Sequence, residues 1–250
     1  MTIVTNQPEA DAANEQRLVK SAERVRDLGE VFTPSHIVND MLSLLPDEMW
    51  RPHPPATFLE PACGDGNFLI AILDRKLQHV TSHTDDPQTR QILALAALAS
   101  IYGVDISPEN ILGGHPEHPI GARDRLLNHL IRWHRRTIGT AVNPRSRFYR
   151  TATWIVTHNI HLGDMLHNQG RDIPIVDYNW QVDEGCVSVT WLTVGLIQTH
   201  ANAGSDPNVL FDEADTTPLP GPAHTTDWDG LHLLTQHPGR QIDLRDGNVT

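Results

Sequence analysis

The feature that most constrains the fold is a turn with two glycines between a short apolar stretch and a longer one. Residues 57–60 form a predicted strand that stops at Pro61, the turn contains Gly64 and Gly66, and residues 68–73 begin a predicted helix. In βαβ units, glycines at this place let the backbone approach a ligand at the carboxyl end of the strand. The third glycine of the dinucleotide fingerprint and the Lys-Ser/Thr of a phosphate loop are both absent, which disfavours NAD and ATP.

Segments with the patterns of strands and helices alternate along the chain. Residues 88–100 are rich in Ala and Leu and predict a helix, residues 101–106 predict a strand, and Pro108 suits an early helical position. Strands that alternate with helices are typical of a parallel α/β sheet. The same patterns predict helices over residues 36–45, capped by Ser35, and 123–137, and strands over residues 153–157, 173–176 and 186–197.

Composition divides the chain into three parts. Residues 1–27 have few large apolar side chains and predict a mobile arm. Residues 201–250 are rich in Asn, Asp, Thr, Pro and Gly, with eight acids against two arginines, and predict a largely disordered acidic tail. The expected folded domain is therefore residues 28–200.

The sequence also indicates a compartment. No stretch approaches about 18 consecutive apolar residues, and the first residues have neither a basic start nor an apolar core, so we expect no membrane span and a cytoplasmic location. The two cysteines, Cys63 and Cys186, exclude a disulfide framework and are expected to be reduced. Fifteen histidines are present, but their spacing does not place four ligands together, so no metal site is expected.

Basic residues gather in one segment of an otherwise acidic chain. The formal net charge is −12, yet eight of the nineteen Lys and Arg residues fall between Arg123 and Arg150. Two interpretations remain open for this segment, a solvated helix face followed by a loop or a surface that contacts phosphates. On the second interpretation the candidate contacts to DNA are Arg132, Arg135, Arg136, Arg145 and Arg147.

Acidic side chains accompany the glycine turn. Glu60 and Asp65 lie on either side of Gly64 and would repel a pyrophosphate, but they suit a cationic ligand that carries an amine. Asp105 ends the next predicted strand, where an acid can hold ribose hydroxyls. S-adenosylmethionine has these properties, because it carries a sulfonium, an ammonium and a ribose.

Four motifs in order and spacing resemble those of N6-adenine DNA methyltransferases, in particular the modification subunits of type I systems and related type II enzymes. They are Gly-Glu-Val-Phe-Thr-Pro at 29–34, Phe-Leu-Glu-Pro-Ala-Cys-Gly-Asp-Gly-Asn-Phe-Leu at 58–69, Tyr-Gly-Val-Asp-Ile at 102–106 and Asn-Ile-His-Leu-Gly-Asp-Met-Leu at 159–166. The resemblance covers about residues 28–180. It implies a Rossmann-like class I methyltransferase sheet dependent on S-adenosylmethionine, with DNA as the substrate.

The resemblance also implies a role for each motif. In the family, the Phe-Thr-Pro segment closes over the methionine end of the cofactor and the glycine turn binds its amino-acid moiety. The acid after the second strand holds the ribose, and the acid after the third strand accepts from the adenine amino group. Carboxylates can accept such hydrogen bonds and apolar side chains cannot. The cofactor-binding residues implied here are Phe32, Thr33, Pro34, Glu60, Ala62, Gly64, Gly66, Asn67, Phe68, Asp105, Ile106, Asp164 and Met165.

The catalytic motif of the family is altered. Transfer to adenine N6 needs a flipped base, an acceptor for its amino group and a stacking ring; the family supplies them as Asn/Asp-Pro-Pro-aromatic after the fourth strand. Here Asp177-Tyr178-Asn179-Trp180 stands at that place. Asp177 and the Tyr178 carbonyl could accept from N6 and Trp180 could stack on the base, although a loop without prolines is less pre-organised. The same residues could equally form an ordinary polar turn.

The predicted sheet is shorter than a methyltransferase sheet of seven strands. After Trp180 only residues 186–197 look like a strand, so we expect truncation after the fourth or fifth strand. Recognition of the DNA target sequence would then come from a separate specificity subunit or from the arginine segment. The principal hypothesis is N6-adenine DNA methylation of the restriction-modification type. The alternatives are a non-catalytic methyltransferase-like subunit that binds cofactor or DNA, and methylation of a small molecule or protein.

Overall fold

The computed structural model describes residues 33–116, 118–166, 173–193, 224–228 and 230–233. The chain divides into two compact units, Met1–Leu45 and Pro46–Thr250. In the first unit, helix α3 (Ser35–Leu42) follows Pro34 as its N-cap. Ser35 is the first helical residue and makes no capping bond, so the prediction that it caps the helix is wrong. The predicted arm of residues 1–27 lies outside the described residues.

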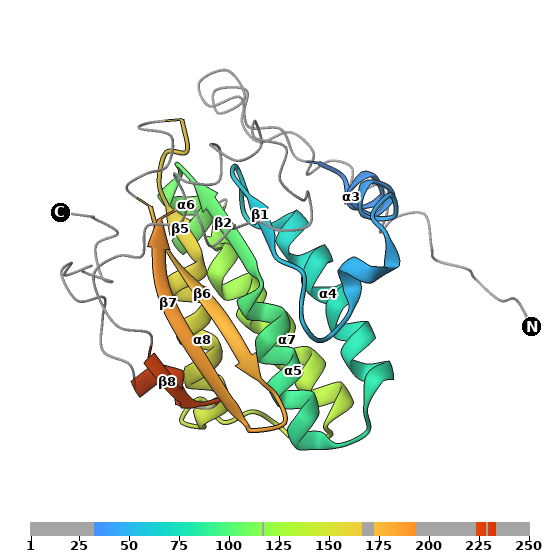
Figure 1. Cartoon of the computed structure of the whole chain (residues 1–250). Helices are drawn as coiled ribbons and strands as arrows, with labels where there is room; N and C mark the ends of the chain where they lie inside the picture. Colours follow the sequence, from blue (N-terminus) through green and yellow to red (C-terminus); the bar gives the residue numbers. More distant parts are fainter. Residues whose placement is uncertain (1–32, 117, 167–172, 194–223, 229, 234–250) are drawn as a thin grey trace, which may run out of the picture. The chain divides into compact units, whose positions relative to one another are not determined.

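Three parallel strands form the central sheet of the second unit, in the order β1-β2-β5. They are β1 (Phe58–Glu60), β2 (Ile101–Asp105) and β5 (Ile160–Leu162). The predictions of strands over 57–60 and 101–106 and of a parallel α/β sheet are confirmed. All three strands end at the same side of the sheet, which we call the carboxyl edge; the opposite side is the amino edge (Figure 1).

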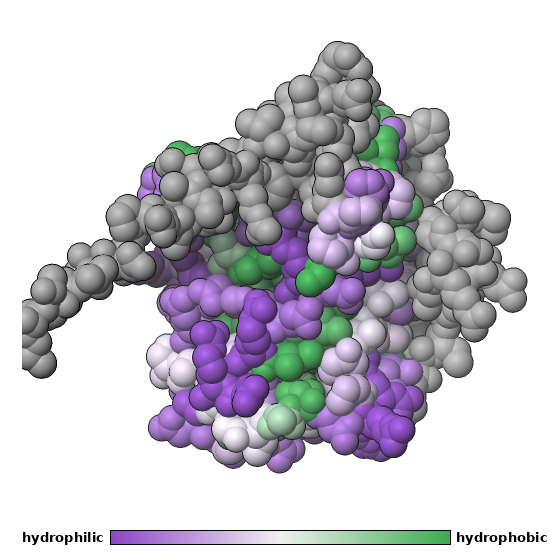
Figure 2. Space-filling view, turned by 180° about the vertical axis from the view of Figure 1, so that it is seen from behind, coloured by the Kyte–Doolittle hydropathy of each residue, from purple (hydrophilic) through white to green (hydrophobic). Residues whose placement is uncertain are grey.

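Within the described residues, four long helices pack around this sheet. α5 (Pro87–Ala99) is buried along its whole second half, which explains its Ala and Leu content. No helix within the described residues is both long and apolar enough to cross a bilayer. Figure 2 shows the molecule from behind, which is the face turned away from the viewer in Figure 1. On this face a hydrophobic strip has hydrophilic side chains on both sides. The other helices are α4 (Asn67–His83), α7 (Ala122–Thr137) and α8 (Arg147–Asn159).

The strand predicted over residues 153–157 is wrong, because these residues form part of α8. Ser146 caps this helix by accepting from the Tyr149 amide. Buried residues recur at helical spacing, with Phe148, Ala152 and Ile155 nearly inaccessible. Burial that recurs every three to four residues therefore outweighs the preference of these β-branched residues for a strand.

A second sheet is antiparallel, in the order β6-β7-β8. β6 (Pro174–Gln181) pairs with β7 (Cys186–Thr193), so β6 is not the fourth strand of the parallel sheet that we expected. β8 (His224–Asp227) and the short helix η4 (Leu231–Leu233) fall within the predicted disordered tail. Leu231 is fully buried, so these residues are ordered parts of a tail that we expected to be largely disordered. The rest of the tail lies outside the described residues.

Strand β6 packs across one face of the parallel sheet. Tyr102 and Val104 of β2 form a buried cluster with Ile173 and Ile175, and the Tyr102 hydroxyl donates to the Val176 carbonyl. In Figure 1 the arrow of β6 points opposite to those of β1 and β2, so β6 runs from the carboxyl edge toward the amino edge. The remaining elements are η1 (Asp47–Trp50), α6 (Pro108–Leu112), β3 (Gly113–His115) and β4 (His118–Ile120).

A buried lysine gives the domain a pH-dependent stability. Lys76 of α4 is 2% exposed and its Nζ donates to the Ala56 carbonyl at 2.6 Å, above the Phe58 ring. Burial lowers the pKa of Lys76 from 10.5 to about 7. The unfolded chain therefore binds more protons between these two pH values, so stability is gained as pH rises through this window and lost as pH falls toward 7.

We expect the free energy of unfolding to rise by about 1–2 kcal/mol between pH 7 and 8.5 because of Lys76. Urea unfolding at several pH values measures this rise. In Lys76→Met, which keeps the length of the side chain without the charge, the rise should be smaller by that amount. Equal slopes in the two proteins would contradict the account.

Candidate cofactor site

Two glycines shape the turn that follows β1. Gly64 and Gly66 have φ angles of 54° and 92°, a region that side chains other than glycine rarely adopt. The turn is fixed to β2 because the Cys63 amide donates to the Val104 carbonyl at 2.9 Å. The Gly66 amide in turn donates to the Cys63 carbonyl, also at 2.9 Å. The glycine pattern in the sequence therefore corresponds to a conformational requirement.

Asp105 is the centre of the carboxyl edge. Its Oδ2 accepts from the Gly64 amide at 2.8 Å, and its Oδ1 accepts from the Ser107 amide at 2.9 Å and from Asn110 Nδ2 at 3.0 Å. Its backbone carbonyl accepts from the Gly163 amide at 3.0 Å, which links the ends of β2 and β5. A carboxylate has about four acceptor positions, so one remains for a ligand hydroxyl. Ser107 and Asn110 were not predicted from the sequence.

Glu60, at the end of β1, and Cys63, in the turn, have raised pKa values. Burial raises the pKa of Glu60, and a hydrogen bond from the Ala62 backbone opposes this shift. A carboxyl group whose ionised form is disfavoured by burial gains from a nearby cation. Burial, followed by the charges of Asp105 and Glu60, raises the pKa of the Cys63 thiol. Cys63 therefore stays protonated and serves as a small packing residue.

The turn borders open space on one side and α7 on the other. A Cβ added at Gly64 would meet nothing within 4 Å, whereas one at Gly66 would lie 3.2 Å from Ala122 Cβ. Ile106, directly after Asp105, leaves 58% of its surface exposed. The carboxyl edge thus combines an approachable backbone, a carboxylate and an uncovered apolar side chain.

The end of β5 brings a third acid to this edge. Asp164 is exposed, and its Oδ1 accepts from the Leu166 amide at 2.8 Å. Met165, which we expected beside the adenine, packs against the cluster around Tyr102 and Val104. Gly163 lies close to the Ile173 side chain, because a Cβ added at Gly163 would come within 2.9 Å of the end of that side chain.

Most of the predicted cofactor residues come together in this way. Those of the second unit lie at the ends of β1, β2 and β5 and in the turn that begins α4. Ala62 is exposed, and Asn67 and Phe68 are half-buried. Thr33 and Pro34 lie in the first unit, before α3, and Phe32 lies outside the described residues.

The residues predicted to be catalytic lie elsewhere. Asp177, Tyr178 and Trp180 belong to β6, so the loop or turn that we expected there is instead a strand paired with β7. The Tyr178 hydroxyl donates to Asn159 Oδ1 at 2.8 Å. The side-chain Nδ2 of Asn159 donates to the carbonyl of Ala99, at the end of α5, and to that of Ile101, at the start of β2. This segment therefore points toward the amino edge and is not brought together with Asp105.

Burial also distinguishes these three residues. Asp177 is exposed, Tyr178 is partly buried and Trp180 is 5% exposed. The rings of Tyr178 and Trp180 stack with centroids 6.3 Å apart. Trp180 is thus engaged in packing of the second sheet, while Asp177 faces solvent.

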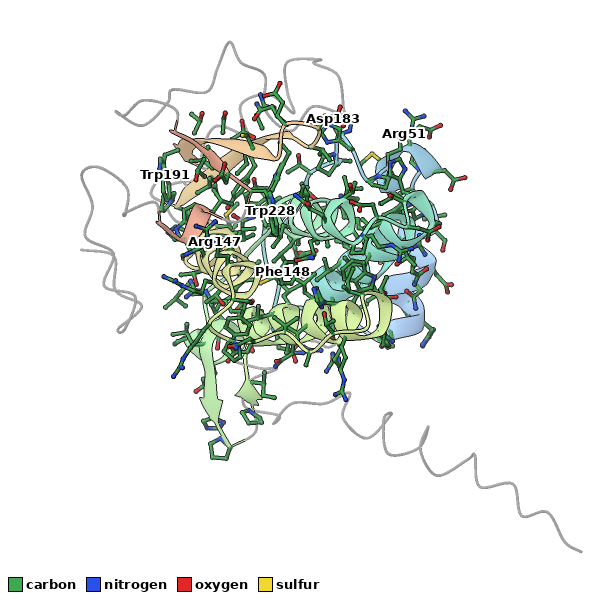
Figure 3. All side chains as sticks on the ribbon, turned by 90° about the horizontal axis from the view of Figure 1, so that it is seen from below. Arg51, Arg147, Phe148, Asp183, Trp191 and Trp228 are labelled. Carbon is green, nitrogen blue, oxygen red and sulfur yellow. The ribbon has the colours of Figure 1, made fainter. Side chains whose placement is uncertain are left out.

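The predicted DNA-contacting arginines lie toward the amino edge as well. They are all exposed, on the second half of α7, before α8 and at its first residue. α7 begins beside Gly66 at Ala122, and Arg135 lies thirteen positions further along the helix, a rise of about 20 Å. The view from below in Figure 3 shows Arg147 of α8 and Asp183 between β6 and β7. The structure does not bring these arginines together with the glycine turn.

The fold and site define a class of protein, an α/β domain whose candidate ligand site lies at the carboxyl ends of parallel strands. Within this class, residues 12–111 match the family model described as N-6 DNA Methylase. The match includes β1, the glycine turn and Asp105, and it confirms the resemblance to N6-adenine DNA methyltransferases. That family has a Rossmann-like fold, uses S-adenosylmethionine and acts on DNA. No curated protein and no solved structure matches the chain.

Proposed function

We propose that this chain binds S-adenosylmethionine at the carboxyl edge and methylates adenine N6 in DNA, as in restriction-modification systems. The observation that carries the cofactor assignment is the position of Asp105, whose carboxylate joins the glycine turn to the end of β2 while Gly64 borders open space. The match of residues 12–111 to the N-6 DNA methylase family supports the same assignment.

The chemistry of the residues fits this cofactor. Asp105 would accept from the ribose, the exposed Ile106 would cover one side of the adenine, and the half-buried Glu60 would attract the ammonium. The remaining assignments are Gly64, Gly66 and Ala62 for close backbone approach, Asn67 and Phe68 behind the turn, Asp164 and Met165 toward the adenine, and Phe32, Thr33 and Pro34 over the methionine end. The bound cofactor supplies an activated methyl group on its sulfonium. A Rossmann-like methyltransferase sheet with fewer strands than the usual seven is part of this proposal.

Catalysis by this chain alone requires an acceptor for the adenine amino group. Asp177 is the proposed acceptor, together with the Tyr178 carbonyl and the Trp180 ring. In β6, however, these residues lie on a strand that runs toward the amino edge. Transfer through Asp177 therefore needs this segment to leave its pairing with β7.

The position of β6 favours a second candidate function. A non-catalytic methyltransferase-like subunit would keep the cofactor site and use it with a partner that supplies the base-holding residues. Such a chain would depend on DNA and on a separate specificity subunit as partners. The exposed arginines near the amino edge, among them Arg132, Arg145 and Arg147, are the proposed phosphate contacts in either case.

Methyl transfer from radiolabelled S-adenosylmethionine to unmethylated DNA tests the two candidates. We expect Asp177→Ala to leave cofactor affinity within about twofold of the wild type, because Asp177 is remote from the glycine turn. Transfer by the wild type that is lost in Asp177→Ala would identify Asp177 as the acceptor. Cofactor binding without transfer would support the non-catalytic subunit, and a large loss of cofactor affinity in Asp177→Ala would contradict the position of β6.

A further inference from the structure

One arginine of the basic segment contacts the glycine turn. Arg125 lies in the first turns of α7, and its Nη1 donates to the Asp65 carbonyl at 2.6 Å. The same Nη1 lies 2.7 Å from Asp65 Oδ2, and Nη2 donates to Asn67 Oδ1 at 2.8 Å. The side chains of Arg125 and Asp65 are only 28% and 16% exposed. A single guanidinium therefore binds both sides of Gly66.

These contacts set Arg125 apart from the other arginines of α7. Arg123 donates to the Ile160 carbonyl at the start of β5, away from the turn. Arg132, Arg135 and Arg136 are exposed on the second half of the helix. The basic run in the sequence therefore contains residues with different roles, and the role of Arg125 is set by its hydrogen bonds and ion pair with the turn.

We propose that Arg125 is a positioning residue for the cofactor site, an inference that rests on the proposed function. It acts in two ways. Its planar guanidinium holds Asp65 and Asn67 together, so the turn around Gly66 keeps its shape before the ligand arrives. Its charge neutralises Asp65, which would otherwise repel the carboxylate at the methionine end of the cofactor, and Glu60 remains the carboxylate that attracts the ammonium.

Substitution of Arg125 separates this role from a general effect on folding. We expect Arg125→Gln to weaken S-adenosylmethionine binding about tenfold or more, and Arg125→Lys to weaken it less because the charge is kept. The matched control is Arg150→Gln, an exposed arginine of α8 to which no contact is assigned, and it should leave the affinity unchanged. Titration calorimetry measures the affinities, and thermal unfolding shows whether each variant is folded.

The charge contribution has its own test. In the double variant Arg125→Gln with Asp65→Asn, the bare carboxylate is gone, so the affinity should recover by about threefold or more relative to Arg125→Gln alone. A residue that only stabilised the fold would give no such recovery. No recovery in the folded double variant would overturn the charge part of the proposal.

Hydrogen exchange of the protein without cofactor tests the positional part independently. The amides of residues 62–68 should exchange faster in Arg125→Gln than in the wild type, and at wild-type rates in Arg150→Gln. Unchanged exchange in Arg125→Gln would overturn the positional role, as would faster exchange with unchanged cofactor affinity. A wild type that exchanges as expected but does not bind S-adenosylmethionine would instead contradict the proposed function.

Discussion

Asp105→Ala is expected to weaken S-adenosylmethionine binding by about 100-fold, which corresponds to about 2.7 kcal/mol. The substitution removes the acceptor proposed for the ribose and the hydrogen bond from the Gly64 amide that holds the turn against β2. It also leaves Asn110, a buried residue, without its carboxylate partner. A hydrogen bond to a charged group contributes about 1.5–3 kcal/mol, so loss of the one bond proposed between the ribose and Asp105 accounts for an effect of this size.

Titration calorimetry on the purified chain measures this change. Asp105→Asn keeps one acceptor oxygen and should have an intermediate affinity, provided that thermal unfolding shows both variants to be folded. The matched control is Asp124→Ala, an exposed acid of α7, which should bind as the wild type does. A folded Asp105→Ala protein with an affinity within threefold of the wild type would contradict the ribose assignment.

The largest effect on stability is expected from Gly121→Ala, about 3 kcal/mol or more in the free energy of unfolding. Gly121 lies between the β3-β4 pair and α7. An added Cβ would overlap the Ile111 carbonyl oxygen and come within 2.5 Å of the Gly113 amide nitrogen. Both are backbone atoms, so neither can rotate away, and α6 or the start of α7 would have to move.

Chemical denaturation compares Gly121→Ala with a control from the same segment. Gly114 has a φ of 91° but an added Cβ there would meet nothing within 4 Å. Gly114→Ala should therefore cost only the backbone strain, about 1–2 kcal/mol. Equal losses in the two variants would show that the close approach at Gly121 does not determine stability.

The arrangement of the carboxyl edge could be predicted from the sequence because its determinants are local. A short apolar strand, two glycines and an acid at the end of the next strand are each visible within a few residues. The structure then places Glu60, Gly64 and Asp105 at one edge because parallel strands end on the same side.

Other elements depend on contacts that the sequence does not display. Residues 173–181 have a composition that suits a strand in the parallel sheet or in the antiparallel sheet. Their pairing with β7 places them in the antiparallel sheet. The residues predicted as a strand at 153–157 form a helix, because burial recurs every three to four residues from Phe148 to Ile155. Arg125 differs from Arg132 only in its place on α7 relative to the turn, which no local pattern reveals.

Hydrogen exchange with and without S-adenosylmethionine tests the central claim, cofactor binding at the carboxyl edge, most directly. The account predicts slower exchange in residues 62–68 and 105–107, which surround Gly64 and Asp105, and no change in residues 177–180 of β6. Protection confined to residues 177–180, or no protection at a saturating concentration of the cofactor, would contradict it.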